Sequence, residues 1–530
     1  MQNVSTEWKR NFGCVDVDDR PNFVPLTYIK ITYVVNDPTA QADAVASDNG
    51  HMDYSNVVQL TDGKDKTFTR FLSLEHNSWA LDGSWTTKPN PITQDTGFVC
   101  SDLCDYHGYW ETNPIITIGF NQVYTTILAG LTTTWSTAYN EWASEYKVNW
   151  YNGDTLVGTY TVKDNVELTS VANCDITNYD RIELEIVRWS KPYHRARVED
   201  ITLGIISIFT KENLMSLSDT RESDLLSLTL PTSEIQFSLA NTDDWWNPDN
   251  PQNAYQYLIE QQKINVRYGL KQENGIEWID SGTFYMSEWN TPQNGITASF
   301  KASSVLEFMN RKFVIPSNLT QTLYDLCEMA FTQAKLQPNS DGSVIWHLDD
   351  SLKNISVTIP SRDGKVAFDH TLAEVVQLCA NASCCTIRIA RNGNVYVEPL
   401  NNTLTDYLID RFVSYSNAEY SMSKPLGSVD INDGMGSVTV ADSGEEQKLR
   451  NDLIQNGTVA NTVAQWVADT LVGRKTLSGE YRADPRADVL DLVTVKNKYA
   501  TNTIVLTSLN YAYSGAFHAS YEGRAVNLDA

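Results

Sequence analysis

Short runs of alternating apolar and polar residues, closed by turns, constrain this chain more than any other feature. They are clearest between residues 263 and 302, where the glycine of the pair Asn294-Gly295 suits a tight reversal. The alternating apolar positions are Ile264, Val266, Tyr268, Phe284, Met286, Ile296, Ala298, Phe300 and Ala302. A period of two predicts strands with one buried face. This segment is therefore predicted to form a small antiparallel barrel.

Length and composition agree with a large β-rich protein. The chain has 530 residues, which predicts about three to five domains at roughly 100–200 residues each. Aromatic residues make up 11% and charged residues only 20%, a balance that suits sheets better than long surface helices. The predicted fold class is mainly β with an α+β middle, comprising two β-barrels, a helix and hairpin region, and an inserted jelly-roll β-sandwich.

Changes in composition along the chain predict five segments. They are a lead segment with the first barrel strand at 1–46, the sandwich at 47–204, the rest of the first barrel at 205–316, the helix and hairpin domain at 317–423, and a second barrel at 424–530. A strand at 28–35 precedes the sandwich, so the simplest account is a barrel interrupted by an insertion. The second barrel is predicted to hold one helix, at about 458–473.

The middle domain carries clear helix signals. Asn318 or Thr320 is placed to cap a helix that has an apolar stripe at helical spacing. Thr371 and Glu374 form a capping box at the start of a second helix. A hairpin at 386–398 follows, because an Asn-Gly pair separates two short alternating runs.

Charge excludes one class of function. Lysine and arginine number 40 against 66 aspartate and glutamate, so the net charge is 40 − 66 = −26. DNA-binding surfaces must neutralise phosphates, so a chain this acidic is not expected to bind DNA directly. The charge is compatible with a channel wall past which DNA slides, and also with acidity that merely keeps a large protein soluble.

The cysteines fit a reduced protein. Cys327 and Cys379 fall on apolar helix faces and are predicted to be core residues. Cys100, Cys104 and His107 have a spacing that could supply three zinc ligands, but no fourth ligand follows at a convincing distance. A disulfide between the first two cysteines is the other possibility. We predict no metal and no cofactor.

The region 47–204 is dense in Trp, Tyr, Thr and Asn and contains a set of distinctive short segments. They are Leu60–Gly63, Leu74–Ser84, Gly97–Ser101, Asn113–Phe120, Val148–Gly153, Asn178–Ile182 and Lys191–Val198. Together these segments resemble a discoidin-like, galactose-binding-type module of the variant found in tail proteins of phages of Gram-positive bacteria. The resemblance implies saccharide binding through loops at one end of the sandwich. Candidate residues are Trp79, Trp85, Trp110, Trp135 and Trp142 for stacking on a sugar ring, and Asn77 and Asp82 for its hydroxyls. Each could equally be a core or turn residue.

From Ser233 to Met309 the predicted elements follow a distinctive order. It runs from an acidic, aromatic loop through a strand ending in Tyr268-Gly269, a Trp strand and a Gly-Thr-Phe-Tyr strand to a closing strand and a short helix. This order resembles the first barrel of a phage tail-tip or baseplate hub. The middle region 371–400 and the last region 424–530 are similar to the corresponding hub domains.

This resemblance implies a structural homotrimer that caps the tail tube. Two like barrels per chain would give six in a trimer, so a threefold hub could sit on a sixfold ring. Implied partners are the distal tail protein or tail-tube ring, the tape-measure protein, receptor-binding or fibre proteins and host cell-wall saccharide, with DNA only in transit. The implied location is the virion tail tip, after synthesis in the host cytoplasm. The first residues lack a secretory apolar core, and no run approaches the ~20 apolar residues of a membrane span.

No catalytic motif is found, so we predict that the protein is not an enzyme. The cluster Arg482, Asp484, Arg486, Asp488 and Asp491 is predicted to be a buried Arg–Asp arrangement at a strand entry. A carboxylate pair for glycoside hydrolysis cannot be identified from spacing among 66 acidic residues. The alternatives are a polysaccharide-active enzyme with a carbohydrate-binding module, or an adhesin without a hub role.

Overall fold

The chain is mainly β and divides into two compact units. The computed structural model describes residues 1–12, 28–36, 38–48, 55–62, 66, 68–77, 85–209, 213–242, 246–247, 262–272, 275–291, 296–336, 344–359, 361–362, 365–366 and 368–526. What we call the main unit holds Met1–Thr32, Ile208–Pro338 and Val344–Ala530, and the inserted unit holds Tyr33–Ser207.

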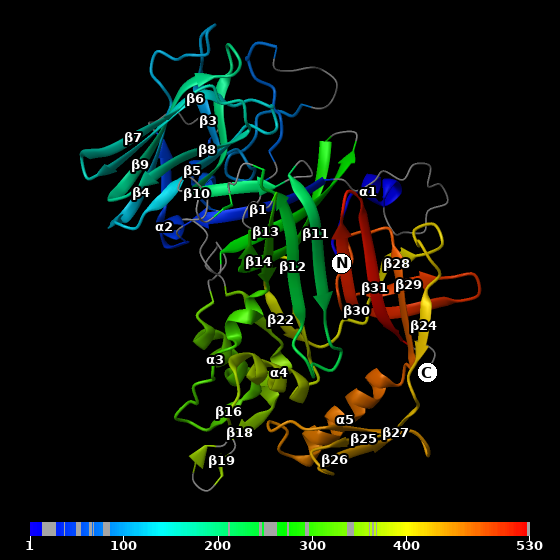
Figure 1. Ribbon diagram of the computed structural model, residues 1–530. Coiled ribbons are helices and arrows are strands. Elements are labelled where there is room, and N and C mark those ends of the chain that lie inside the picture. Colours follow the sequence, from blue (N-terminus) through cyan, green and yellow to red (C-terminus); the bar gives the residue numbers. More distant parts are fainter. Residues whose placement is uncertain are drawn as a thin grey trace. The chain divides into compact units, whose positions relative to one another are not determined.

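One sheet of the main unit combines strands from distant parts of the sequence (Figure 1). Its order is β24-β28-β31-β30-β11-β12-β15-β14-β13, and β29 and β23 extend it beside β30. The bounds are β11 (Leu214–Glu222), β12 (Thr232–Ala240), β13 (Lys263–Gln272), β14 (Gly275–Asn290), β15 (Thr297–Ser303), β23 (Leu404–Ile409), β24 (Glu419–Met422), β28 (Lys475–Tyr481), β29 (Leu492–Lys496), β30 (Thr501–Tyr513) and β31 (Phe517–Ala525). β11 and β30 pair antiparallel and form the seam of the sheet.

The predicted alternation sets which face of this sheet is buried. Of the nine predicted apolar positions, all but one are buried, from Ile264 in β13 to Ala302 in β15. Ile296 is the exception, with 68% of its surface exposed. It lies before β15 begins at Thr297, outside the ladder, so the prediction of a core role for it is wrong. The turn pair Asn294-Gly295 lies outside the described residues.

The middle of the main unit is an α+β region built around two helices. Thr371 caps α4 (Leu372–Ala382) and Glu374 completes the capping box, which confirms the predicted helix start. The cap of α3 (Leu323–Ala334) is Thr322, whose hydroxyl accepts the amide of Asp325. Neither Asn318 nor Thr320 caps this helix, because the chain first forms β16 (Thr320–Thr322). The nearest hydroxyl to the helix therefore takes the capping role.

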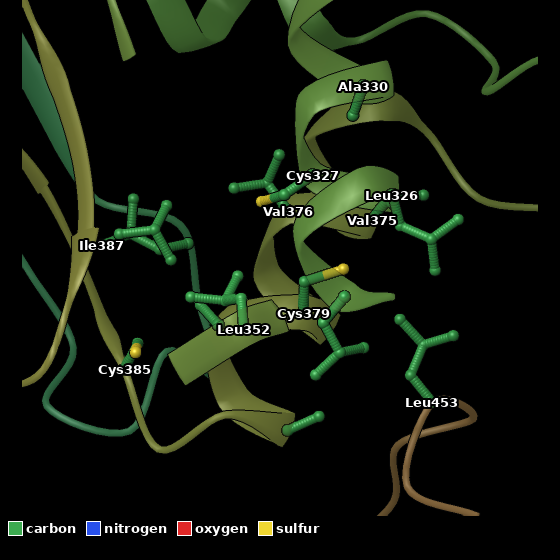
Figure 2. Close-up of a cluster of buried hydrophobic side chains, with 14 of the residues drawn as sticks. Leu326, Cys327, Ala330, Leu352, Val375, Val376, Cys379, Cys385, Ile387 and Leu453 are labelled. Atoms are coloured by element: carbon green, nitrogen blue, oxygen red, sulfur yellow. The ribbon is translucent and has the colours of Figure 1, made fainter. Parts of the chain in front are cut away.

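The core between these helices confirms the predicted place of two cysteines. Cys327 and Cys379 are fully buried, from α3 and α4. Figure 2 shows them among Val376, Leu352 and Ile387. The predicted hairpin is formed by β21 (Thr386–Ile389) and β22 (Val395–Glu398), and Leu453 reaches the same core from a later segment.

The other described elements of the main unit are short, apart from one helix. They are α1 (Thr6–Asn11), η3 (Val305–Met309), β17 (Trp346–Leu348), η4 (Asp350–Asn354), β18 (Ser356–Thr358), β19 (Ser361–Arg362), β20 (Lys365–Val366), β25 (Leu426–Ile431), β26 (Gly436–Thr439), β27 (Glu445–Leu449) and α5 (Gly457–Leu471). α5 is the helix predicted near 458–473, and Asn456 caps it. Across the described residues, none of the helices is long and apolar enough to cross a membrane.

The inserted unit packs two sets of strands around an aromatic core. One sheet has the order β2-β4-β9-β6-β7, and the other set is β10-β5-β8 with β3 on β10. The bounds are β1 (Tyr28–Asn36), α2 (Pro38–Asp43), β2 (Val45–Asp48), η1 (Val57–Leu60), β3 (Phe98–Leu103), β4 (Ile115–Tyr124), β5 (Leu128–Trp135), β6 (Ala143–Asn152), β7 (Thr155–Val162), β8 (Thr169–Ile176), β9 (Tyr179–Trp189) and β10 (Arg195–Phe209). Trp135 lies at the core, 5.0 Å from Tyr146 and 6.0 Å from Trp189 between ring centroids.

The mainly β class with a helical middle is therefore confirmed. The barrels and the jelly roll are not, because the described strands pair into open sheets and none closes on itself. The five segment boundaries, including 47–204 for the sandwich, remain predictions from the sequence.

Candidate functional surfaces

The first candidate surface is the polar face of the main sheet. Because facing residues of paired strands point to the same side, the register defines rows that cross many strands. One row is Glu480, Ser520, Asn510, Thr220, Glu234 and Ser303, and the next is Glu419, Ser478, Glu522, Ser508, Glu222 and Thr232. We call this surface the polar wall. Most alternate positions are buried. They carry apolar side chains such as Leu217, Phe237 and Tyr513, and in β11 also the charged side chains of Asp219 and Arg221.

Small hydroxyl and amide side chains cover most of the polar wall. Ser218 donates to the Asn510 side chain across the β11–β30 seam at 3.0 Å, and Ser238 and Ser299 are bonded at 3.1 Å. Hollows lie over the described strands of the wall. A hollow of about 820 Å³ lies over β11, β12, β15 and β14, and one of about 520 Å³ lies over β28, β30 and β31.

The charge of the polar wall is negative. Its acidic side chains are Glu222, Glu234, Glu288, Glu419, Glu480 and Glu522. Lys301 is on the same face and pairs with Glu234 at 2.8 Å. Arg524 is also on it, but its guanidinium donates to the backbone carbonyls of Gly473 and Leu471. The described surface is therefore broad, polar and acidic, and the wall residues named above do not form the cluster of free cations that phosphate binding needs.

The predicted saccharide residues are scattered in the inserted unit. Trp135 is fully buried, and its indole N–H donates to the hydroxyl of Ser170. Its ring therefore has no face that a ligand could reach, and Trp135 is not a saccharide-binding residue. Trp110 and Trp142 are half-buried against the core. Trp79 and Asp82 lie outside the described residues.

The two remaining candidates lie on the segments that border this gap. Trp85 packs edge-on against Tyr139, with ring centroids 5.7 Å apart, and Arg70 lies over its ring. Asn77 is exposed at φ +52°, a left-handed conformation that asparagine tolerates. Trp85 and Asn77, together with the half-buried Trp110 and Trp142, are the described residues that remain candidates for the predicted saccharide surface.

A buried cluster of charges lies beneath these segments, and sequence reasoning missed it. Glu75 and Arg197 form a bidentate ion pair, and both are nearly inaccessible. The Arg197 guanidinium also lies 3.9 Å from the centroid of the Tyr139 ring, whose hydroxyl bonds the backbone of Phe71. Burial alone would raise the pKa of Glu75, but the hydrogen bonds and charge of Arg197 bring that pKa below its usual value. The segment 71–77 is therefore fixed to the sheet by charge.

The same cluster continues to a second segment of the chain. Glu141 contacts Nδ1 of His194 at 2.8 Å and accepts the indole N–H of Trp189 at 2.9 Å. The other nitrogen of His194 bonds the backbone oxygen of His76 at 2.7 Å. Burial disfavours a charged His194, but the Glu141 carboxylate raises the pKa of the imidazole. With both ring nitrogens occupied by the fold, His194 is placed to hold loops and not to transfer protons.

The other chemical candidates have structural surroundings. Cys100 and Cys104 are buried free thiols, so the disulfide is ruled out, and burial raises the pKa of Cys100 to about 11. Within the described ranges, no group of three His, Cys, Asp or Glu side chains is placed to hold a metal. Asp484 and Arg486 form a fully buried ion pair at 2.9 Å, as predicted.

Comparisons with known proteins give distant structural similarity only. No protein-family model matches the chain, and no curated protein matches it. Similar solved structures include the 43 kDa tail protein of prophage MuSo2 from Shewanella oneidensis (12% identity, TM-score 0.42, 60% of this chain and 94% of that one). Others are the tail protein from Neisseria meningitidis (9%, 0.42, 61% and 93%) and a prophage tail protein from Listeria monocytogenes (11%, 0.39, 62% and 93%). Values this low do not assign the chain to a family.

Proposed function

We propose that the protein is a structural tail-tip hub of a bacteriophage or a phage-derived particle. The observation that carries the proposal is the main sheet, in which strands of the two regions predicted as hub barrels join at the β11–β30 seam and share one polar wall. The resemblance of segments 233–309, 371–400 and 424–530 to hub domains supports the same function. Its activity is assembly, and no bond-making residue is assigned.

The proposed assembly is a homotrimer beneath the last ring of the tail tube. Each chain supplies two sets of strands side by side, so three chains supply six sets around an axis. A threefold protein of this kind would match a sixfold ring. Its proposed partners are the distal tail protein or the tube ring, the tape-measure protein, and receptor-binding or fibre proteins.

The polar wall is proposed to line the channel that the trimer closes or gates. Carboxylates along the wall repel the phosphates of DNA, and small hydroxyls leave few side chains for a passing chain to catch on. A nucleic acid or tape-measure protein would then leave without being retained. The acidic net charge of −26 is consistent with this role.

The inserted unit is proposed to be an outward accessory module that contacts cell-surface saccharide or other baseplate proteins. Glu75, Arg197, Glu141 and His194 all bond other groups of the fold, which favours recognition over catalysis. Release of reducing sugar from purified cell wall would favour the enzyme alternative instead.

Cryo-electron microscopy of the purified protein, alone and with its tail-tube or distal tail partner, tests the assembly. The expected result is a threefold ring with the polar wall inside. A protein that stays monomeric under both conditions would contradict the hub and leave the adhesin alternative.

A charge reversal tests the wall itself. We expect Glu222→Lys with Glu522→Lys to keep the trimer but to retain DNA in a salt-dependent manner, because two neighbouring wall carboxylates become cations. The control is Glu111→Lys with Asp442→Lys, which makes the same charge change at two exposed positions that are not members of the polar wall. Equal DNA retention by both double variants would refute the channel role of this face.

A further inference from the structure

Four exposed rings of the inserted unit form a continuous surface that the sequence did not indicate. The rings of His76 and Tyr193 lie 6.1 Å apart, Tyr193 and Tyr106 lie 6.4 Å apart, and Tyr106 and His107 lie 5.2 Å apart, measured between centroids. Tyr106 is 69% exposed and Tyr193 43% exposed. We call these four residues the aromatic patch.

The loops that carry the patch are held rigidly from below. The Asp105 carboxylate accepts the amides of His107 and Tyr109, both at 2.8 Å. These hydrogen bonds, that of Tyr109 foremost, lower the pKa of Asp105. The amide of Cys104 donates to the backbone oxygen of His194, so the loop before Tyr106 is tied to the loop that follows Tyr193.

His76 is fixed to the same framework. Its backbone oxygen bonds Nε2 of His194, and its amide donates to the backbone oxygen of Tyr193 at 3.5 Å. The buried charge cluster thus holds three separate segments in one arrangement, and the patch needs little ordering when a ligand binds.

Tyr193 has a strained backbone conformation. Its φ is +59°, in the left-handed region that a bulky side chain rarely adopts. Burial does not offset this strain, because the ring is 43% exposed. Strained residues of this kind concentrate at ligand contacts.

The chemistry of the patch favours a saccharide over an apolar partner. Flat tyrosine rings present apolar faces, and their hydroxyls both donate and accept hydrogen bonds. Neutral imidazoles likewise carry one donor and one acceptor. A pyranose offers the matching surfaces, namely a face of C–H groups and a rim of hydroxyls that also donate and accept. The patch also begins one residue before Asn77 and the candidates Trp79 and Asp82.

We propose that the aromatic patch is the saccharide-binding surface of the inserted unit, with Tyr106 and Tyr193 stacking on a pyranose ring and His76 and His107 bonding its hydroxyls. This proposal rests on the accessory role under the proposed function and adds the residues that bind the saccharide.

The test is isothermal titration of the full chain with purified Gram-positive cell-wall polysaccharide and with galactose, glucose, rhamnose and N-acetylglucosamine. Tyr193→Gly is the decisive variant, because glycine relieves the positive φ and removes the ring. We expect its thermal stability to equal or exceed that of the unmodified protein while its affinity for the bound saccharide falls at least about tenfold. Tyr106→Ala should lose a similar factor.

Tyr499→Ala is the matched control, since Tyr499 is 85% exposed and belongs to the main unit. Its affinity should not change. No binding of any of these saccharides, or unchanged binding by Tyr193→Gly, would overturn the proposal. Trimer formation and tube binding by the same variants are measured separately, so that failure of the patch is distinguished from failure of the hub.

Discussion

The two units each contain a buried network of charges, and the networks connect different kinds of element. In the main unit, Arg221 of β11 bonds Asp219 and Asp488, and Arg391 also reaches Asp488. This network joins a sheet strand, a hairpin loop and a late loop. In the inserted unit, Arg197 and Glu75 attach a surface segment to one strand. The first network holds the architecture together, and the second presents a surface.

The largest expected effect comes from breaking the network of the main unit. Arg221→Ala would leave Asp219 and Asp488 buried without their shared cation, which costs about 3–5 kcal/mol. The free energy of unfolding in urea measures it. The control is Arg267→Ala, which breaks a half-exposed pair with Asp280 and should cost less than about 1 kcal/mol. Similar losses in both variants would contradict a special role for the buried network.

Breaking the network of the inserted unit should cost about 3 kcal/mol locally. Arg197→Ala leaves the Glu75 carboxylate buried without its cation. The backbone amides of residues 71–77 should then exchange their hydrogens with solvent faster, which hydrogen exchange measures, and saccharide binding should weaken. The exchange of the α3 and α4 amides should stay as it was. Faster exchange there as well would show that the two networks do not act separately.

A third test uses the pH dependence of stability through Glu199 of the inserted unit. Its carboxylate accepts hydrogen bonds from the amide and hydroxyl of Thr137 and from the amide of Ala138. Burial raises the pKa of Glu199 to about 7 from 4.5. Because the folded pKa is the higher one, its contribution is fully present below pH 4.5 and is lost as the pH rises through 7. Glu199→Gln should therefore raise the free energy of unfolding by about 3 kcal/mol at pH 8 and by little at pH 4.5. A melting curve of the variant that shifts equally at both pH values would contradict this.

The smallest expected effect is at the helix starts. Thr371→Ala and Thr322→Ala should each cost about 1 kcal/mol, because each removes a hydroxyl that accepts an amide of the first helical turn. Thr320→Ala should cost less, although the sequence places Thr320 as a possible cap. The free energy of unfolding separates these outcomes, and an equal cost at Thr320 would show that the cap is not decisive.

Local patterns predicted local structure well. The period of two from 263 to 302 identified the buried side chains of three strands, and a capping box located α4. Both signals arise from neighbours within a few residues of each other. The prediction that Ile296 is buried was wrong, because the periodicity of a sequence does not show where the hydrogen-bonded ladder of a strand ends.

The candidate surfaces could be predicted much less, because they join residues that are remote in sequence. Glu75 and Arg197 are separated by 122 positions, so neither charge has a recognisable local partner. The sequence left Trp135 open between stacking on a sugar and filling the core, because aromatic rings do both, and the structure buries it. The aromatic patch depends on loops that only the folded sheets bring together.

The β11–β30 seam also bears on how such a chain can be made. The seam pairs residues about 290 positions apart, as in the bond between Ser218 and Asn510. During synthesis β11 is completed long before β30 leaves the ribosome, and until then one edge of β11 has no strand to pair with. Exposed edges of that kind recruit other chains, and contacts so distant in sequence form slowly. This protein is therefore most exposed to aggregation on crowded polysomes, while its chains are still being synthesised. Chaperones that shield nascent strands should raise the yield of folded protein more than a lower growth temperature, which acts on chains already released from the ribosome.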